Sequence, residues 1–234
     1  MGVRLLWNGR VRGNGGIQLL RILIKKKILI LMRLLTGKRL FSTFTTKHGK
    51  RVCMEGPGCQ MNVNDAELVT GILCRPELGY ERVSEPEQAD IALLMTCSVR
   101  EAAEDKAWSR LDWLASLQKK DMVDGRPRLH TIGVLGCMAE RLKLSVFERK
   151  PFINVVCGPD SYKALPQLLE SATSGNKAVD VDLSMHETYD EELIESVRNP
   201  LSKSAFVSIM RGCNNMCTFC IVPFTRGRER SRPI

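Results

Sequence analysis

The sequence predicts an α/β fold built on a parallel sheet, followed by the start of a second α/β unit. Two observations support this fold class. From residue 51 to about 171, short apolar runs alternate with helical stretches, which is the pattern of βαβ units. Near the other end, an apolar run at residues 205–210 leads into an Arg-Gly turn and three cysteines spaced C-x3-C-x2-C. A chain of 234 residues is long enough for one large or two modest domains.

The amino-terminal part of the chain differs in charge from the rest. Residues 1–54 contain no Asp or Glu but hold 13 of the 35 Lys and Arg residues. The remainder has 22 basic and 26 acidic side chains, so the formal net charge of +9 does not indicate a basic, nucleic-acid-binding body. An Arg-rich, acid-free stretch with Ser and Thr is typical of transit peptides. We expect residues 1–49 to be a disordered mitochondrial leader; the alternative is a cytoplasmic protein with a basic tail.

The apolar run at residues 17–35 does not predict a membrane span. Five cations interrupt it: Arg21, Lys25, Lys26, Lys27 and Arg33. A spanning helix needs about twenty residues with few or no charges. Nine cysteines would suit a secreted disulfide scaffold, but the length and the lack of a secretory signal peptide argue against one. Reduced thiols that serve metal centres fit better.

The elements of the first unit, residues 50–172, follow in order. We expect strands at residues 51–54, 81–83, 91–96, 130–136 and 153–157. We expect helices at residues 62–74 and 98–118, a third opening at 138 and a fourth ending near 171. Asn62 or Asn64 would cap the first helix and Ser98 the second. Residues 173–204 are polar and punctuated by Pro and Gly, so they are predicted to be a linker.

Three cysteines each follow a predicted strand: Cys59, Cys97 and Cys137. The carboxyl ends of parallel strands lie at one edge of a sheet, where ligands bind, so the fold would bring the three together. Gly58 and Gly136 precede two of them, which suits tight turns or close approach of a bulky ligand. Cys157 also ends a strand, so the residues alone leave it open as a fourth ligand. Cys53 and Cys74 are interpreted as packing residues.

The other three cysteines, Cys213, Cys217 and Cys220, predict a soft metal centre. Thiolates favour zinc or iron–sulfur clusters over hard cations. A [4Fe–4S] cluster usually takes four cysteines, so three would leave one iron open to a substrate. Cys217 and Cys220 alone would also suit a redox pair or half a zinc knuckle. No Cys or His follows Cys220 to complete a zinc site.

This second cysteine spacing, with Phe219 before the last cysteine, resembles the radical S-adenosylmethionine (SAM) superfamily. Four earlier segments resemble the amino-terminal domain of the methylthiotransferases: Gly58-Cys-Gln-Met-Asn-Val-Asn-Asp65, Thr96-Cys-Ser-Val-Arg-Glu101, Gly133-Val-Leu-Gly-Cys-Met-Ala-Glu-Arg141 and Gly158-Pro-Asp160. Residues 206–233 resemble the start of that family's radical SAM barrel. The most similar branch converts N6-isopentenyladenosine at tRNA position 37 to its 2-methylthio form. It includes animal mitochondrial proteins associated by name with a regulatory subunit of cyclin-dependent kinase 5.

The resemblance implies a Rossmann/flavodoxin-like methylthiotransferase domain over residues 50–172 and the incomplete start of a partial TIM barrel over residues 205–234. It implies two [4Fe–4S] clusters, without Cys157. Cys59, Cys97 and Cys137 would hold an auxiliary cluster that carries sulfur. Cys213, Cys217 and Cys220 would hold the cluster that binds and cleaves SAM, with Phe219 near SAM. A 5′-deoxyadenosyl radical would then take the hydrogen from adenine C2. The implied partners are tRNA and an electron donor, with no membrane.

Two departures from the family pattern stand out. An aromatic and a hydroxyl residue usually precede Gly-Cys in the first motif, where this chain has Gly56 and Pro57; this would alter the loop around Cys59. The chain also stops at Ile234, after the first barrel strand, so we expect a fragment or truncated isoform that is inactive by itself. Arg226, Arg228 and Arg230 would face substrate phosphate or the active-site mouth, or be ordinary surface charges.

Three other functions remain open from the sequence. One is methylthiolation of threonylcarbamoyl-adenosine in tRNA, and another is methylthiolation of a ribosomal protein. Both are disfavoured by the Gly-Cys-Gln-Met-Asn and Thr-Cys-Ser-Val-Arg-Glu motifs. The third is a non-catalytic protein that binds a kinase-regulatory subunit, as the name of the animal branch suggests.

Overall fold

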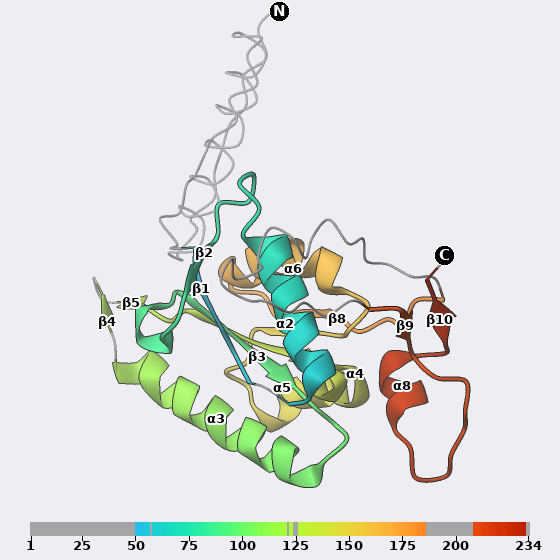
Figure 1. Cartoon of the computed structure of the whole chain (residues 1–234). Helices are drawn as coiled ribbons and strands as arrows, with labels where there is room; N and C mark the ends of the chain where they lie inside the picture. The colour runs from blue at the N-terminus through green and yellow to red at the C-terminus, as the bar shows by residue number, and fades with distance from the viewer. Residues whose placement is uncertain (1–49, 57, 121, 124–125, 186–207, 233–234) are drawn as a thin grey trace, which may run out of the picture. The chain divides into compact units, whose positions relative to one another are not determined.

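A six-stranded parallel sheet forms the centre of the computed structural model, which describes residues 50–56, 58–120, 122–123, 126–185 and 208–232 (Figure 1). The strand order is β2-β1-β3-β6-β7-β8, and every neighbouring pair is parallel. The strands are β1 (Arg51–Glu55), β2 (Glu81–Val83), β3 (Ile91–Thr96), β6 (Thr131–Gly136), β7 (Val155–Cys157) and β8 (Ala178–Asp180). The predicted α/β class is therefore confirmed. The expected leader lies outside the described residues.

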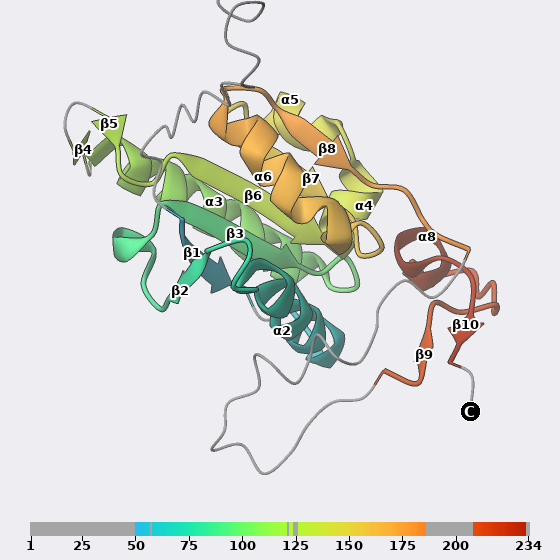
Figure 2. The ribbon, with the colours of Figure 1, turned by 90° about the horizontal axis from the view of Figure 1, so that it is seen from above.

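Helices cover both faces of the sheet (Figure 2). One apolar cluster joins the sheet to α2 (Gln60–Leu73) and α6 (Leu165–Thr173). The other joins it to α3 (Glu101–Lys120), α4 (Cys137–Leu142) and α5 (Ser145–Arg149). All six residues of β3 and of β6 are buried, because each of these strands is paired on both sides and covered on both faces. Their continuous apolar runs in the sequence have this cause.

Smaller elements complete the first unit. Two 3-10 turns, η1 and η2, and a short antiparallel hairpin, β4–β5, connect the larger elements. η1 spans Pro86–Gln88 and η2 spans Tyr162–Ala164, and the hairpin strands are β4 (Met122–Val123) and β5 (Arg126–Pro127). In the described part of the chain, no helix is long and apolar enough to cross a membrane.

The helix starts differ from those predicted. Cys59, with φ −145° and ψ 178°, is the N-cap of α2, not Asn62 or Asn64. Asn62 instead donates a hydrogen bond to the Thr96 carbonyl at 2.6 Å, so a tertiary contact uses the side chain that local propensity assigns to capping. The second helix, α3, begins at Glu101, after the expected Ser98 cap.

The predicted linker begins with ordered structure. Ala178–Asp180 forms β8, the edge strand that pairs with β7, so the sheet continues past the expected domain boundary at residue 172. The sequence gives little sign of this strand, because three residues within a polar stretch show no clear alternation. Residues 186–204 of the expected linker lie outside the described residues.

The carboxyl-terminal segment, residues 208–232, has only short elements. β9 (Met210–Arg211) pairs antiparallel with β10 (Arg230–Ser231), and α8 (Val222–Arg226) lies between them. β9 therefore pairs within its own segment, and residues 205–207 of the expected first barrel strand lie outside the described residues, so the barrel start stays a prediction. The described residues of this segment and of the sheet belong to one compact unit, Lys47–Ile234.

Candidate functional site

The first three cysteines gather at the carboxyl edge of the sheet. Cys97 directly follows β3 and Cys137 directly follows β6. The last residues of these strands, Thr96 and Gly136, are register partners, so the two cysteines leave the sheet side by side. The loop of Cys59 packs on the same place: a Cβ built on Gly58 would lie 2.6 Å from the Cβ of Cys97. The parallel topology thus brings together three residues that are far apart in sequence.

A chain of hydrogen bonds connects the three cysteine loops. The Cys59 thiol donates to Asn62 Oδ1 at 2.9 Å, and Asn62 Nδ2 donates to the Thr96 carbonyl at 2.6 Å. The Thr96 hydroxyl in turn donates to the Leu135 carbonyl at 2.6 Å. Asn62 and Thr96 are buried, where such bonds contribute most to a fixed geometry. Sequence reasoning missed this role, although both residues belong to the quoted motifs.

The environments of the three thiols differ. Cys59 is exposed, whereas Cys97 and Cys137 are buried. Burial raises the pKa of Cys137, and the nearby Arg226 guanidinium opposes that rise. The Val99 backbone N–H donates to Cys97 Sγ at 3.4 Å. Two of the three sulfurs therefore already receive a hydrogen bond or a positive charge from the surrounding protein.

The donor set of the first site consists of thiols. Among the described residues, no three His, Cys, Asp or Glu side chains lie close enough to hold one metal ion. Iron–sulfur clusters are held mainly by cysteine thiolates. Cys59, Cys97 and Cys137 supply donors of that type from loops at one edge of the sheet. The assignment of Cys59, Cys97 and Cys137 as ligands stays a prediction.

The second cysteine set lies in one loop between β9 and α8. The Cys213 N–H donates to the Gly227 carbonyl at 3.2 Å, which closes the base of the loop. The Cys220 N–H donates to the Cys217 carbonyl at 3.0 Å, which makes a tight turn at its end. Phe219 is 92% exposed. A role for these cysteines in binding a SAM cluster, and for Phe219 in contacting SAM, stays a prediction.

The remaining cysteines have structural positions. Cys157 is fully buried within β7 in one of the two apolar clusters, and burial raises its pKa well above the ordinary value. Cys53 is buried in β1, and burial raises its pKa to about 11. Cys74 is the half-buried C-cap of α2. The packing role predicted for Cys53 is confirmed, and Cys157 lies in the core.

Buried ion pairs join the carboxyl-terminal segment to the sheet domain. Arg226 Nη1 lies 2.6 Å from Asp65 Oδ2, and Arg211 Nη2 lies 3.2 Å from Asp65 Oδ1. Arg230 Nη1 lies 2.9 Å from Asp160 Oδ2. The side chains of all five residues are at most 6% exposed.

These positions correct the expectation for two arginines. Arg226 and Arg230 are neither surface charges nor free to meet substrate phosphate, because buried aspartates of the sheet domain neutralise them. Arg228 is exposed, as an ordinary surface charge would be. An exposed arginine and a buried one look alike in sequence, and the partner aspartates lie more than sixty residues away.

Arg226 also touches one of the predicted cluster ligands. Its Nε donates to Cys137 Sγ at 3.2 Å, and its helix α8 packs against α4, which Cys137 opens. Burial opposes the charge on Arg226, but Asp65 and Cys137 raise its pKa. The segment that carries the second cysteine set is thereby connected, through one side chain, to the first set.

A buried glutamate near this site predicts a pH dependence of stability. Burial raises the pKa of Glu140 from its ordinary value of 4.5 to about 7, although Lys143 lies 3.5 Å away. The contribution of Glu140 to stability should therefore fall as the pH rises from 4.5 to 7, since the unfolded chain releases this proton first. Glu140→Gln should remove that loss, so its stability relative to wild type should grow by about 3 kcal/mol between pH 4.5 and 8.

Urea unfolding across this pH range measures the effect. Glu148→Gln, at an exposed site on the neighbouring helix α5, is the matched control and should leave the pH profile unchanged. A profile of Glu140→Gln that is parallel to that of wild type would show that Glu140 does not titrate in this range.

Comparison with known proteins places these residues in a family. Residues 51–158 match the model described as "Uncharacterized protein family UPF0004". The "Mitochondrial tRNA methylthiotransferase CDK5RAP1" of Rattus norvegicus is 50% identical over 188 residues, which cover 79% of this chain and 31% of that protein. The Homo sapiens protein of the same name is 50% identical over 188 residues, covering 79% and 30%.

A bacterial relative is about as similar to this chain as the mitochondrial relatives are. The "tRNA-2-methylthio-N(6)-dimethylallyladenosine synthase" of Chloroherpeton thalassium is 49% identical over 187 residues, which cover 79% of this chain and 38% of that protein. The chain thus spans about a third of the length of the relatives it matches. Over the residues it shares with them, the chain belongs to the methylthiotransferase family.

Proposed function

We propose that the chain serves in the methylthiolation of tRNA, the conversion of N6-isopentenyladenosine at position 37 to its 2-methylthio form. The observation that carries this proposal is the convergence of Cys59, Cys97 and Cys137 at one edge of the sheet. The names of the relatives support the same reaction, and "dimethylallyladenosine" favours the isopentenyl substrate over threonylcarbamoyl-adenosine.

The proposed cofactors are two [4Fe–4S] clusters and SAM. Cys59, Cys97 and Cys137 would hold the auxiliary cluster, and Cys213, Cys217 and Cys220 the SAM-binding cluster. When bound, these groups would supply the sulfur and the radical that an unactivated aromatic carbon requires. Hydrogen bonds to the ligand sulfurs, or to side chains that contact them, orient the ligands and change the reduction potential of the cluster. Here Asn62 would orient Cys59, and Arg226 would fix Cys137.

The proposed organisation follows from the same family. Residues 1–49 would be a mitochondrial leader, which the acid-free composition and the names of the mammalian relatives support. The sheet domain would present the auxiliary cluster, and residues 205–234 would begin the radical SAM domain. The proposed partners are tRNA and an electron donor.

Mass spectrometry of tRNA tests the proposal. Cells that lack the gene should lose 2-methylthio-N6-isopentenyladenosine, and re-expression of the gene should restore it. The gene with Cys97→Ala should not restore it, whereas Cys74→Ala, at a half-buried cysteine away from the site, should. Unchanged modification in the deleted cells would contradict the proposed function. A change in the threonylcarbamoyl derivative alone would favour the alternative substrate.

A further inference from the structure

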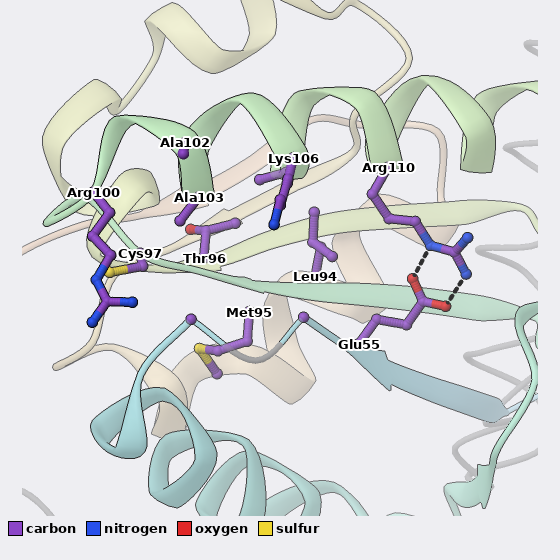
Figure 3. A pocket seen from close by; sticks show the side chains of 13 residues that line it. Glu55, Leu94, Met95, Thr96, Cys97, Arg100, Ala102, Ala103, Lys106 and Arg110 are labelled. Atoms are coloured by element: carbon purple, nitrogen blue, oxygen red, sulfur yellow. Dashed lines mark hydrogen bonds and ion pairs between the residues drawn. The ribbon is translucent and has the colours of Figure 1, made fainter.

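A cavity of about 790 Å³ lies between α3 and the carboxyl ends of β1 and β3 (Figure 3). From β1, the next strand in the sequence, β2, lies on one side, and β3 and the later strands lie on the other side. The strand order therefore reverses between β1 and β3. In open α/β sheets, ligands bind in the crevice at such a switch point, outside the strand ends. The volume is in the range of cavities that hold small organic ligands. Cys97, a proposed ligand of the auxiliary cluster, lies at one end of the cavity, and the proposed reaction assigns no ligand to the space along α3.

The charged groups around the cavity favour an anion. At one end of the cavity, the Arg110 guanidinium donates two hydrogen bonds to the Glu55 carboxylate, at 2.6 and 2.7 Å. The charges of these two side chains therefore neutralise each other. Arg100 and Lys106 also line the cavity, and neither makes an ion pair with any residue that the structure describes. Figure 3 shows Arg100 beside Cys97, and Lys106 pointing from α3 toward the strand ends. Two such cations suit a phosphate group.

The rest of the lining favours a flat apolar group. Leu94 of β3 forms one wall, and Ala103 and Ala107 of α3 form the opposite wall. Met95, the next residue of β3, points to the other face of the sheet (Figure 3). Alanine leaves space above the helix where a larger side chain would close the cavity. Stacking between apolar walls is a common way to hold a nucleic-acid base. The cavity thus combines a charged end with an apolar slot.

We propose that this cavity binds a nucleotide, with its phosphate between Arg100 and Lys106 and its base between Leu94 and the two alanines. The ligand is a phosphate ester of a nucleoside, either a free mononucleotide or one nucleotide of an RNA strand. The proposal goes beyond the methylthiolation of adenosine 37, because neither cysteine set has to carry a cluster for this binding. If the source is RNA, the cavity would position the strand beside Cys97.

Isothermal titration of the full chain with adenosine 5′-monophosphate and with adenosine tests the phosphate requirement. The monophosphate should bind at least tenfold more tightly than adenosine. Arg100→Gln/Lys106→Gln should weaken monophosphate binding at least tenfold. The matched control, Lys119→Gln/Lys120→Gln, removes two charges from the last turn of the same helix and should leave binding unchanged. Equal affinity of the cavity variant and the control variant for the monophosphate would overturn the proposal. Equal affinity of the wild type for adenosine and for adenosine 5′-monophosphate would overturn it too.

A second variant tests the location. Ala103→Phe should fill the apolar slot and abolish binding, with thermal unfolding showing that the variant is folded. Undiminished binding by folded Ala103→Phe would also refute this site. A hexa-adenylate RNA separates the two sources: tighter binding than the monophosphate assigns the cavity to RNA, and weaker binding assigns it to a free nucleotide. Failure of these titrations with tRNA methylthiolation intact would reject the cavity alone, and the reverse result would reject only the proposed reaction.

Discussion

Asp65→Ala is expected to lower the free energy of unfolding by about 3–5 kcal/mol, because it leaves buried arginines without their shared counter-charge. Asp65 is 1% exposed and lies 2.6 Å from Arg226 Nη1 and 3.2 Å from Arg211 Nη2. It also accepts a hydrogen bond from the Tyr162 hydroxyl at 3.2 Å. Chemical denaturation of the variant and of the wild type measures the loss.

Glu67→Ala is the matched control for this substitution. Glu67 lies on the same helix, carries the same charge and is only half-buried. Its loss should change stability by no more than about 0.5 kcal/mol, as surface substitutions do. The Asp65 variant should also expose the segment 208–232 to limited proteolysis, since this carboxylate joins it to the sheet domain. Equal stability losses in the two variants would contradict the buried ion-pair account.

Gly136→Ala is expected to destabilise the fold by about 3 kcal/mol, from backbone strain and overpacking together. Gly136 has φ 92° and ψ −154°, a region that is essentially restricted to glycine. A Cβ at this position would lie 2.7 Å from the Thr96 carbonyl oxygen, which is backbone and cannot turn aside. Thermal unfolding of the variant measures the cost. Because Gly136 precedes Cys137, the same strain would move that thiol.

Gly175→Ala separates the two contributions. Gly175 also has a positive φ, 88°, but nothing lies within 4 Å of a Cβ built there. Its substitution should cost about 1 kcal/mol of strain without the clash. If Gly136→Ala costs no more than Gly175→Ala, the close packing of β3 against β6 at this point is not as described.

The sequence predicted the sheet and the positions of the first cysteines for a physical reason. Buried parallel strands are continuous apolar runs, and β3 and β6 have that form. The residues that follow such strands must lie at one edge of the sheet, so the positions of Cys97 and Cys137 follow from the sequence alone. Short elements were harder to predict. β8 has only three residues and exists because β7 offers it a pairing edge, which is a long-range cause.

The predictions that were wrong concern side chains with long-range partners. Asn62 has the propensity of a helix cap, but its hydrogen bond to the Thr96 carbonyl decides its position. Arg226 and Arg230 have the composition of a surface loop, yet Asp65 and Asp160 allow them to be buried. Local sequence contains no sign of such pairs, because each partner alone has the pattern of an exposed charge.

Iron and sulfide quantification on anaerobically reconstituted protein tests the central claim most directly, namely that Cys59, Cys97 and Cys137 hold a [4Fe–4S] cluster. Cys59→Ala/Cys97→Ala/Cys137→Ala should contain about four fewer irons and four fewer sulfides per chain than the wild type. The control Cys53→Ala/Cys74→Ala should lose none. Unchanged iron in the triple variant, or zinc in place of iron in the wild type, would contradict the assignment.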